Sequence, residues 1–426
     1  MSEVKDEKKK RPIAKSMQML KAQTASIYEA AWEAADKGEH IGWSTAIFPQ
    51  ELCETFGIPM LFPENNAASV SARHLGPELI QHAEGEMRYP INICSYARLN
   101  IGMADLAQKN RLDWPKEEPY MPIPTFLCLA NNSCTQLMKW YENLSRNINI
   151  QIFFMYCLYN YYEEDPAKYK VKYVRRQIEK NIKKKEAYFG KKFDWDRFLE
   201  VQKRSQINRK LFDEIVALNQ HKPAPLDGFQ LFSYLSCVVI ARGKESTTLI
   251  LEQLKKEMLE HIANGTSTFG STPEKYRIHW EGIGCWPHLG HNLKTLKKNG
   301  VNCVINGYVT AWSVAYEPGD LDGMAKAYQL SSTNSFSTPS IMEKRTETIR
   351  DFGCDGMLCH VNRSCKLMTF HIFVGRELIE QNAKVPVTNF DGDQSDDRVY
   401  SEAQFETRLQ GLVEVMEANK EAKQNA

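Results

Sequence analysis

Hydrophobic residues follow two different spacings along this chain, and their alternation predicts strands joined by helices. Apolar residues recur at helical spacing over residues 16–38, and a shorter apolar run at 40–48 is typical of a strand. Further strands are expected at 60–62, 124–130 and 149–158, and further helices at 50–56, 69–86 and 134–147. Because the connections are short, this order predicts a parallel sheet with helices on both faces.

The middle of the chain has a different pattern. Long amphipathic helices are expected at 169–188, 194–219, 229–241 and 246–263. Strands are expected again at 277–284, 302–309, 355–361 and 386–390, and helices at 290–299, 320–329, 340–352, 366–381 and 401–422. We therefore expect an α/β protein with two Rossmann- or flavodoxin-like parallel-sheet domains and a helical domain between them. The expected boundaries are a disordered basic tail at 1–15, an α/β domain at 16–162, a helical domain at 163–270 and a second α/β domain with a final helix at 271–426.

Composition narrows the class of protein. The 426 residues are 42% hydrophobic and carry a net charge of +1, so no strong attraction to nucleic acid or to an anionic membrane is expected. No apolar run approaches the ~20 residues that span a bilayer. Eleven cysteines without an evident secretory signal argue for a reducing compartment rather than a disulfide framework. We expect a cytoplasmic protein that binds neither nucleic acid nor membrane.

Cys94, Cys134 and Cys365 lie in polar or cationic surroundings, where strands are expected to end. A thiolate ligand needs nearby cations or hydrogen-bond donors to lower its pKa. The cations that could do this are Arg98, Arg363 and Lys366. Three thiolates can hold an iron–sulfur cluster and leave one iron open to substrate, because full protein ligation takes four. The spacing alone leaves this open, since buried cysteines are also common in protein cores.

Other candidate sites are weaker. The remaining cysteines occur in apolar contexts (Cys53, Cys157, Cys237 and Cys303) or in ambiguous ones (Cys128, Cys285, Cys354 and Cys359). The chain has no Cys-x-x-Cys pair, so a zinc ribbon has no support. His288 and His291 have a metal-compatible spacing, but a capping or surface role is favoured. The acidic segment 391–397 lacks the distal glutamate of a calcium loop, and segment 243–246 lacks the upstream glycine of a phosphate-binding loop.

Polar motifs fall at the expected carboxyl ends of several strands, which is where open α/β sheets bind ligands. This coincidence is the strongest argument from the residues alone for a site. The motifs are Trp43-Ser44-Thr45, Pro63-Glu64-Asn65, Asn131-Asn132-Ser133-Cys134, Glu281-Gly282-Ile283, Asn362-Arg363-Ser364-Cys365 and Asp391-Gly392-Asp393-Gln394.

Taken together, these motifs resemble the alpha subunits of 2-hydroxyacyl-CoA dehydratases, which share a superfamily with benzoyl-CoA reductases. The resemblance runs from about residue 20 to residue 420. It rests on Gly-Trp-Ser-Thr (42–45), Pro-Glu-Asn-Asn-Ala-Ala (63–68), Asn-Asn-Ser-Cys (131–134), Trp-Glu-Gly-Ile-Gly-Cys-Trp-Pro (280–287), Asn-Arg-Ser-Cys-Lys-Leu-Met (362–368) and Phe-Asp-Gly-Asp-Gln-Ser-Asp (390–396). Within the family, Trp-Pro-His-Leu-Gly-His (286–291) is similar to the lactoyl-CoA and 2-hydroxyisocaproyl-CoA enzymes.

The resemblance implies a heterodimer of two related subunits, each with a [4Fe-4S] cluster on three cysteines, which here are Cys94, Cys134 and Cys365. A separate ATP-hydrolysing iron–sulfur activator would inject one electron. The implied reaction is a hydro-lyase step in which (R)-2-hydroxyacyl-CoA loses water through a ketyl radical to give 2-enoyl-CoA. Such a cluster predicts oxygen sensitivity.

Glu64 matches the family's carboxylate near the substrate, so the resemblance implies a base or a hydroxyl-orienting group at this position. Ala46 stands where related subunits often carry a serine. Ser44 or Thr45 would then supply that contact. Two alternatives stay open, an ATP-dependent aromatic acyl-CoA reductase and a non-catalytic electron-relay subunit. The identity of the acyl group and the presence of a flavin in the complex are also open.

Overall fold

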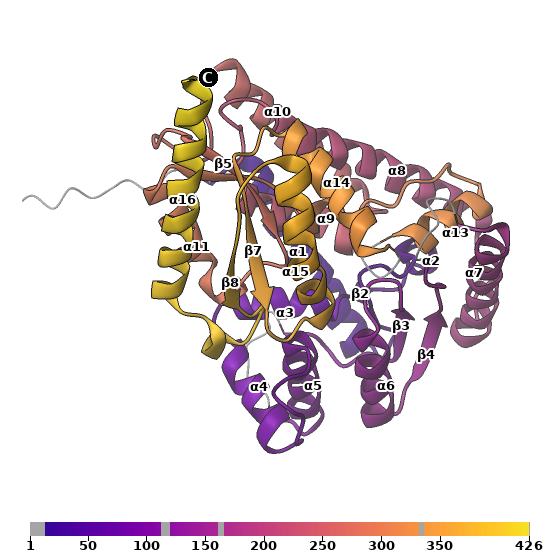
Figure 1. Cartoon of the computed structure of the whole chain (residues 1–426). Helices are drawn as coiled ribbons and strands as arrows, with labels where there is room; N and C mark the ends of the chain where they lie inside the picture. Colours follow the sequence, from indigo (N-terminus) through magenta and orange to yellow (C-terminus); the bar gives the residue numbers. More distant parts are fainter. Residues whose placement is uncertain (1–12, 112–119, 161–165, 332–335, 426) are drawn as a thin grey trace, which may run out of the picture.

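The computed structural model describes residues 13–111, 120–160, 166–331 and 336–425, and it contains two four-stranded parallel sheets (Figure 1). The first sheet has the order β2 (Met60–Leu61), β1 (Gly42–Ser44), β3 (Phe126–Ala130) and β4 (Gln151–Met155). The second has the order β6 (Val301–Asn306), β5 (Tyr276–Glu281), β7 (Gly356–Asn362) and β8 (Val387–Gly392). The predicted α/β class is confirmed. Most of the predicted basic tail lies outside the described residues.

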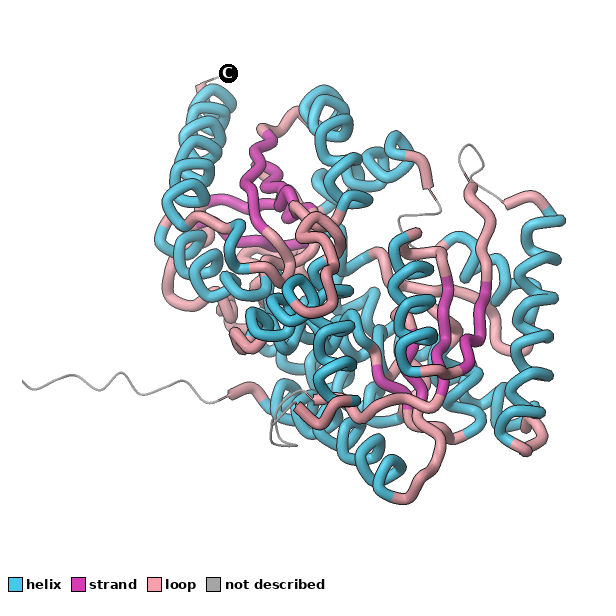
Figure 2. Tube along the Cα trace, turned by 90° about the horizontal axis from the view of Figure 1, so that it is seen from below, coloured by secondary structure: helices cyan, strands magenta, loops and turns pink. Residues whose placement is uncertain are grey.

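Helices surround both sheets (Figure 2). Those of the first third are α1 (Lys15–Asp36), α2 (Gln50–Phe56), α3 (Pro63–Ala72), α4 (Gly76–Gly85), α5 (Ser95–Gln108) and α6 (Gln136–Ile148). The middle segment forms α7 (Lys168–Phe189), α8 (Trp195–Leu218), α9 (Gly228–Ile240) and α10 (Glu245–Ala263). The last third holds η1 (Trp286–His288), α11 (Leu289–Lys298), α12 (Gly307–Thr310), α13 (Leu321–Leu330), α14 (Thr338–Asp351), α15 (Lys366–Ala383), η3 (Asp397–Val399) and α16 (Glu402–Gln424).

Two local expectations differ from the structure. The helix expected at 69–86 is two helices, because His74 adopts a left-handed backbone (φ 60°) between α3 and α4. The strand expected at 149–158 is shorter, since β4 ends at Met155, and it is an edge strand on which Gln151 and Phe154 are exposed. The polar motif at Pro63 follows the end of β2, as expected, and it also forms the first turn of α3, where proline fits well.

The middle helices pack on both sheets. Phe126 of β3 and Phe153 of β4 meet Tyr188 and Phe189 of α7, with ring centroids 5.1 to 6.3 Å apart. On the other side, the Phe229 ring of α9 lies 5.1 Å from Trp280 of β5. One continuous hydrophobic core therefore runs from the first sheet through the helices to the second. The division into three domains stays a prediction.

Gly102 marks the closest approach of α5 to α4. A Cβ atom at this position would lie 2.1 Å from the Leu79 carbonyl oxygen, which belongs to the α4 backbone and cannot rotate away. We expect Gly102→Ala to lower the free energy of unfolding by about 3 kcal/mol, because overpacking forces the two helices apart. Urea denaturation measures this. Gly411→Ala is the matched control, since Gly411 is a helical glycine with nothing near its Cβ position, and its replacement should be neutral or stabilising. Equal effects of the two substitutions would contradict the prediction.

Candidate active site

The three predicted cysteines line one pocket that encloses about 740 Å³, including the part open to solvent. Cys134 follows β3, and Cys365 follows β7, as expected. Cys94 does not follow a strand; it ends a loop after α4, so that expectation was wrong. All eleven cysteines are free thiols, and these three are partly exposed, whereas the other eight are buried.

Each of the three cysteines immediately precedes or caps the start of a helix. Cys94 is the N-terminal cap of α5 and Cys365 is that of α15. Cys134 lies just before α6, where the Gln136 backbone N–H donates to its sulfur at 3.3 Å. Backbone N–H groups of the first turns likewise reach the sulfurs of Cys94 and Cys365. Three helix N-termini, each with partial positive charge, therefore converge on one pocket and favour an anionic group there.

The cations expected to activate these thiols are engaged elsewhere. Arg98 pairs with Glu84 and Asp396, Arg363 pairs with Asp391 at 3.1 Å, and Lys366 donates to the Arg363 carbonyl. Burial raises the pKa of Cys94 to about 12, and it raises the pKa values of Cys134 and Cys365 as well. The expectation of cation-activated thiolates was wrong. Within the described residues, the positive charge directed at these sulfurs is that of the three helix N-termini.

Hydrogen bonds join the Cys94 and Cys365 loops directly. The Ser364 hydroxyl accepts from the Ser95 backbone N–H and donates to the Ser95 hydroxyl, both at 3.1 Å. The Ser364 N–H donates to Asp393 at 3.0 Å. The second Asp393 oxygen accepts backbone N–H groups from the next turn at 2.9 and 3.0 Å. These bonds hold the loops of two of the three cysteines together.

The Asn131-Asn132 pair fixes the third cysteine loop. The Asn131 side chain exchanges two hydrogen bonds with the Cys157 backbone, and the Asn132 amide donates to the Tyr328 carbonyl at 3.0 Å. The structure therefore gives these asparagines a supporting role beneath Cys134.

Glu64, in the first turn of α3, lines the same pocket. Its Oε1 accepts the Ala46 backbone N–H at 3.2 Å, whereas its buried Oε2 has no hydrogen-bond partner among the described residues. Burial raises the pKa of this carboxyl to about 7, although the Ala46 N–H and the nearby Tyr141 hydroxyl oppose the shift. A free carboxylate oxygen with a pKa near neutrality can accept a proton.

Ser44 and Thr45 are buried in the first sheet. The Ser44 hydroxyl donates to the Thr45 carbonyl at 3.0 Å, and the Thr45 hydroxyl accepts the Ala130 N–H at 3.0 Å. Neither residue is among the described residues that line the pocket. The structure thus brings Glu64 together with the three cysteines and leaves Ser44 and Thr45 to one side. Their contact with substrate stays a prediction.

An apolar and aromatic wall faces the cysteines, and the sequence reasoning missed it. Tyr308 and Trp312 lie one helical turn apart, with ring centroids 5.2 Å apart. The apolar run at 302–309 predicts a strand through residue 309, but β6 ends at Asn306, whose side chain accepts from two N–H groups of the next turn. The other apolar members of the wall are Leu137, Trp140, Ile283, Ala311, Leu367 and Met368.

The cation that lines the pocket is already paired. Arg345 donates through Nε to Glu281 at 2.7 Å, and His371 lies 3.1 Å from the other Glu281 oxygen. Although burial opposes it, Arg345 and His371 hold the pKa of Glu281 well below its usual range. The pocket therefore offers a neutralised ion pair rather than a free positive charge.

His279, in β5 beside this cluster, makes folding sensitive to acid. Burial and Arg345 lower its pKa from 6.5 to about 4, against the opposing effect of Glu281. Between pH 4 and pH 6.5, this histidine is protonated in the unfolded chain but neutral in the folded chain. The free energy of unfolding is therefore undiminished above pH 6.5 and falls as the pH falls toward 4. We expect a loss of about 2 kcal/mol at pH 5 from this residue. Urea unfolding at pH 7 and pH 5 should show a smaller loss of stability in His279→Leu than in the wild type. The control His261→Leu, at a partly exposed position, should lose as much as the wild type. An unchanged pH dependence in His279→Leu would contradict this.

The described residues contain no group of three His, Cys, Asp or Glu side chains placed to hold a single metal ion. The three cysteines surround open space instead, as the ligands of a multi-iron cluster would. Sulfur donors are the ligands that iron–sulfur clusters require, so the donor set fits such a group. His288 stacks on Tyr400 with centroids 4.1 Å apart, and His291 bonds the Tyr400 hydroxyl, in keeping with the favoured non-metal role.

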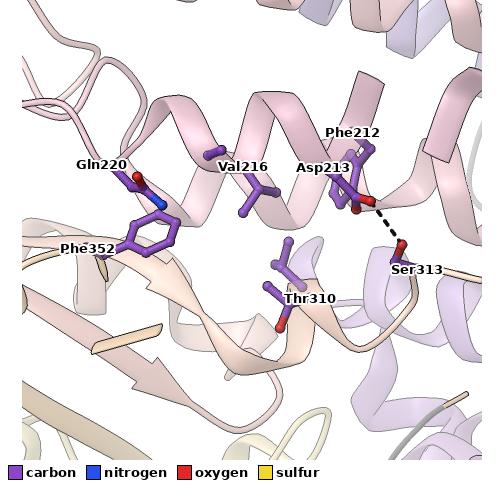
Figure 3. Close-up of a pocket in the computed structure, with 9 residues that line it drawn as sticks. Phe212, Asp213, Val216, Gln220, Thr310, Ser313 and Phe352 are labelled. Carbon is purple, nitrogen blue, oxygen red and sulfur yellow. Dashed lines mark hydrogen bonds between the residues drawn. The ribbon is translucent and has the colours of Figure 1, made fainter. Parts of the chain in front are cut away.

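A second pocket lies between α8 and α12 (Figure 3). Asp213 faces it and is paired with Arg209 and, at 3.4 Å, with the Ser313 hydroxyl. The rest of its lining is largely apolar, and it contains no cysteine or histidine. It therefore offers no comparable chemistry.

In the part of the chain that the structure describes, no helix has the length and apolar character to cross a membrane.

Comparison with known proteins gives one consistent result. The family model described as 2-hydroxyglutaryl-CoA dehydratase, D-component, matches residues 45–416. The (R)-2-hydroxyisocaproyl-CoA dehydratase alpha subunit of Clostridioides difficile is 41% identical, over 93% of this chain and 95% of that protein. The (R)-phenyllactyl-CoA dehydratase alpha subunit of Clostridium sporogenes is 36% identical, over 96% and 97%. A benzoyl-CoA reductase subunit of Thauera aromatica is 24% identical, over 94% of each chain.

Proposed function

This chain belongs to the 2-hydroxyglutaryl-CoA dehydratase D-component family, and we propose that it is the substrate-binding subunit of an iron–sulfur 2-hydroxyacyl-CoA dehydratase. The proposed reaction removes water from (R)-2-hydroxyacyl-CoA to give 2-enoyl-CoA. The observation that carries it is a single pocket with three partly exposed cysteines, three helix N-termini and one buried carboxylate. Higher identity to dehydratase subunits than to the reductase subunit favours elimination over reduction.

Cys94, Cys134 and Cys365 would hold a [4Fe-4S] cluster, with the first turns of α5, α6 and α15 pointing N–H groups at its sulfurs. When bound, this group supplies one electron and an open Lewis-acidic iron for the substrate oxygens. Three protein ligands would leave one iron position free, and the aromatic wall lines the same pocket.

Glu64 would take the proton from the β-carbon of the substrate. That proton is not acidic in the starting thioester, but it becomes so once a ketyl radical of the substrate has expelled the neighbouring hydroxyl. The electron that formed the ketyl radical is returned when the product forms, so the overall reaction consumes no electrons. The unpartnered Oε2 is the atom that would accept the proton, while the Ala46 N–H holds Oε1 in place. The apolar wall would exclude water from the radical.

The alpha-subunit names of the relatives imply a partner subunit for those proteins. We propose the same arrangement here, with a related second subunit and a separate ATP-hydrolysing iron–sulfur activator as electron donor. A cytoplasmic location would suit both the free thiols and an oxygen-sensitive cluster.

The wall also supports a substrate class, a 2-hydroxyacyl-CoA with an uncharged, apolar acyl side chain. The acyl side chain would pack against the rings of Trp140, Tyr308 and Trp312. Arg345 would not attract a charged side chain, because Glu281 neutralises it. A carboxylate buried without a free partner costs several kcal/mol. We therefore expect kcat/KM to be at least about a hundredfold higher for 2-hydroxyisocaproyl-CoA or phenyllactyl-CoA than for 2-hydroxyglutaryl-CoA.

The assay uses the complex of this chain with its partner subunit and activator, supplied with ATP and a reductant, and measures the enoyl-CoA product. A preference for the glutaryl thioester would contradict the substrate class. Reduced product with stoichiometric consumption of electrons would instead favour the reductase alternative. Turnover that survives replacement of Glu64 and Cys365 would favour the electron-relay alternative.

A further inference from the structure

Gln394 places an amide group against one of the three cysteine sulfurs. It lies in the turn after β8, is 1% exposed and lines the pocket. Its Nε2 donates to the Cys94 sulfur at 3.2 Å, and its Oε1 accepts the Asn362 side-chain N–H at 2.8 Å. The family resemblance assigns no role to this residue.

The orientation of the Gln394 amide is fixed from both sides. Asn362 ends β7, and its own carbonyl accepts the Thr369 hydroxyl at 2.7 Å, which ties it to the first turn of α15. A metal-bound thiolate sulfur can only accept hydrogen bonds, so the nitrogen end of the amide must face Cys94. Because the side chain is buried and held at its oxygen, it cannot rotate away from the sulfur.

This contact distinguishes Cys94 from the other two cysteines. Cys134 accepts the Gln136 backbone N–H at 3.3 Å, and Cys365 lies near the first-turn N–H groups of α15. Within the described ranges, Cys94 is the one sulfur of the three that accepts from a side chain. A side-chain donor can be changed by substitution, whereas main-chain donors cannot.

We propose that Gln394 is a positioning residue that raises the reduction potential of the cluster on this chain. The inference rests on the proposed function, because it requires the cluster. An N–H donor withdraws charge from a ligand sulfur and so favours the form with one more electron. Gln394 would thereby make the substrate-side cluster easier to reduce by the activator.

The test is a redox titration of the complex purified without oxygen, followed by electron paramagnetic resonance and absorbance. Gln394→Leu removes the donor, and Gln394→Glu keeps the shape but replaces the N–H with an oxygen. We expect both variants to keep about four irons on this chain. At the wild-type midpoint, the ratio of reduced to oxidised cluster should fall about fivefold in Gln394→Leu, which corresponds to about 40 mV for one electron. It should fall further in Gln394→Glu, because a negative charge then faces the sulfur.

Ser395→Ala is the matched control. It removes a hydroxyl from the same turn that bonds Ser71 at 2.6 Å and touches no cysteine, so the midpoint should not change. The partner subunit is identical in all samples, so a change in midpoint potential between samples comes from the cluster on this chain. An unchanged midpoint in both Gln394 variants would overturn the inference and leave the proposed function standing. A wild-type chain without iron in the reconstituted complex would overturn the proposed function itself.

Discussion

Cys365→Ala is expected to empty the site of iron. The wild-type chain, purified without oxygen, should hold about four irons and four sulfides, and the variant less than about one. The reason is that Cys365 supplies one of only three protein ligands, and no other described cysteine lines the pocket to replace it. Iron and acid-labile sulfide analysis with an electronic spectrum measures this, and dehydration should fall to the background of the assay.

Cys237→Ala is the control for Cys365→Ala. Cys237 is buried in α9 and away from the pocket, so its loss should leave a small cavity and full iron content. A Cys365→Ala chain that keeps its iron would rule out the proposed ligand set. Iron lost equally from both variants would point to misfolding rather than to a missing ligand.

Glu64→Gln should abolish proton transfer while leaving the cluster in place. We expect kcat to fall by about 10²- to 10⁴-fold, the usual contribution of a positioned general base. The amide oxygen of glutamine can still accept the Ala46 N–H, so the fold and the iron content should be retained. Steady-state kinetics and iron analysis on the same preparation separate these effects.

Glu86→Gln provides the comparison for Glu64→Gln. Glu86 forms a surface ion pair with Arg111 and is not among the residues that line the pocket, so kcat should not change. Full activity of Glu64→Gln would show that the base is another group. In that case Glu64 would serve only to hold the first turn of α3 against Ala46.

Most of the secondary structure could be predicted because amphipathic spacing reports directly on a helix or strand with one buried face. Helix α5 was missed for the same reason. Nearly every residue from Ser95 to Ala107 is buried, so the helix has no polar stripe to reveal its period. The break at His74 was also missed, although Gly76-Pro77 lies just after it and such a pair is a strong sign that one helix ends and another begins.

The site was predictable only in part. The rule that ligands bind at the carboxyl ends of parallel strands marked Cys134 in the first sheet and Cys365 in the second, and only the family resemblance brought the two together. The charges around the cysteines depend on ion-pair partners that are far away in the sequence. Arg98, four residues beyond Cys94, is neutralised by Asp396, which no local pattern links to it. The aromatic wall likewise depends on α12 following β6 immediately, at a point where the apolar run gave no sign of a helix.

The hydrogen bond between Ser95 and Ser364 joins two residues that are synthesised at widely separated times during translation. Cys94 and Cys134 emerge early in synthesis, whereas Cys365 emerges only after the middle helices and most of the second sheet. The pocket proposed to bind iron therefore does not exist on a nascent chain, and metal delivery would have to wait until translation is nearly complete. A cluster bound to the three cysteines would tie the first third of the chain to the last, so it should slow unfolding and proteolysis by stabilising the folded chain.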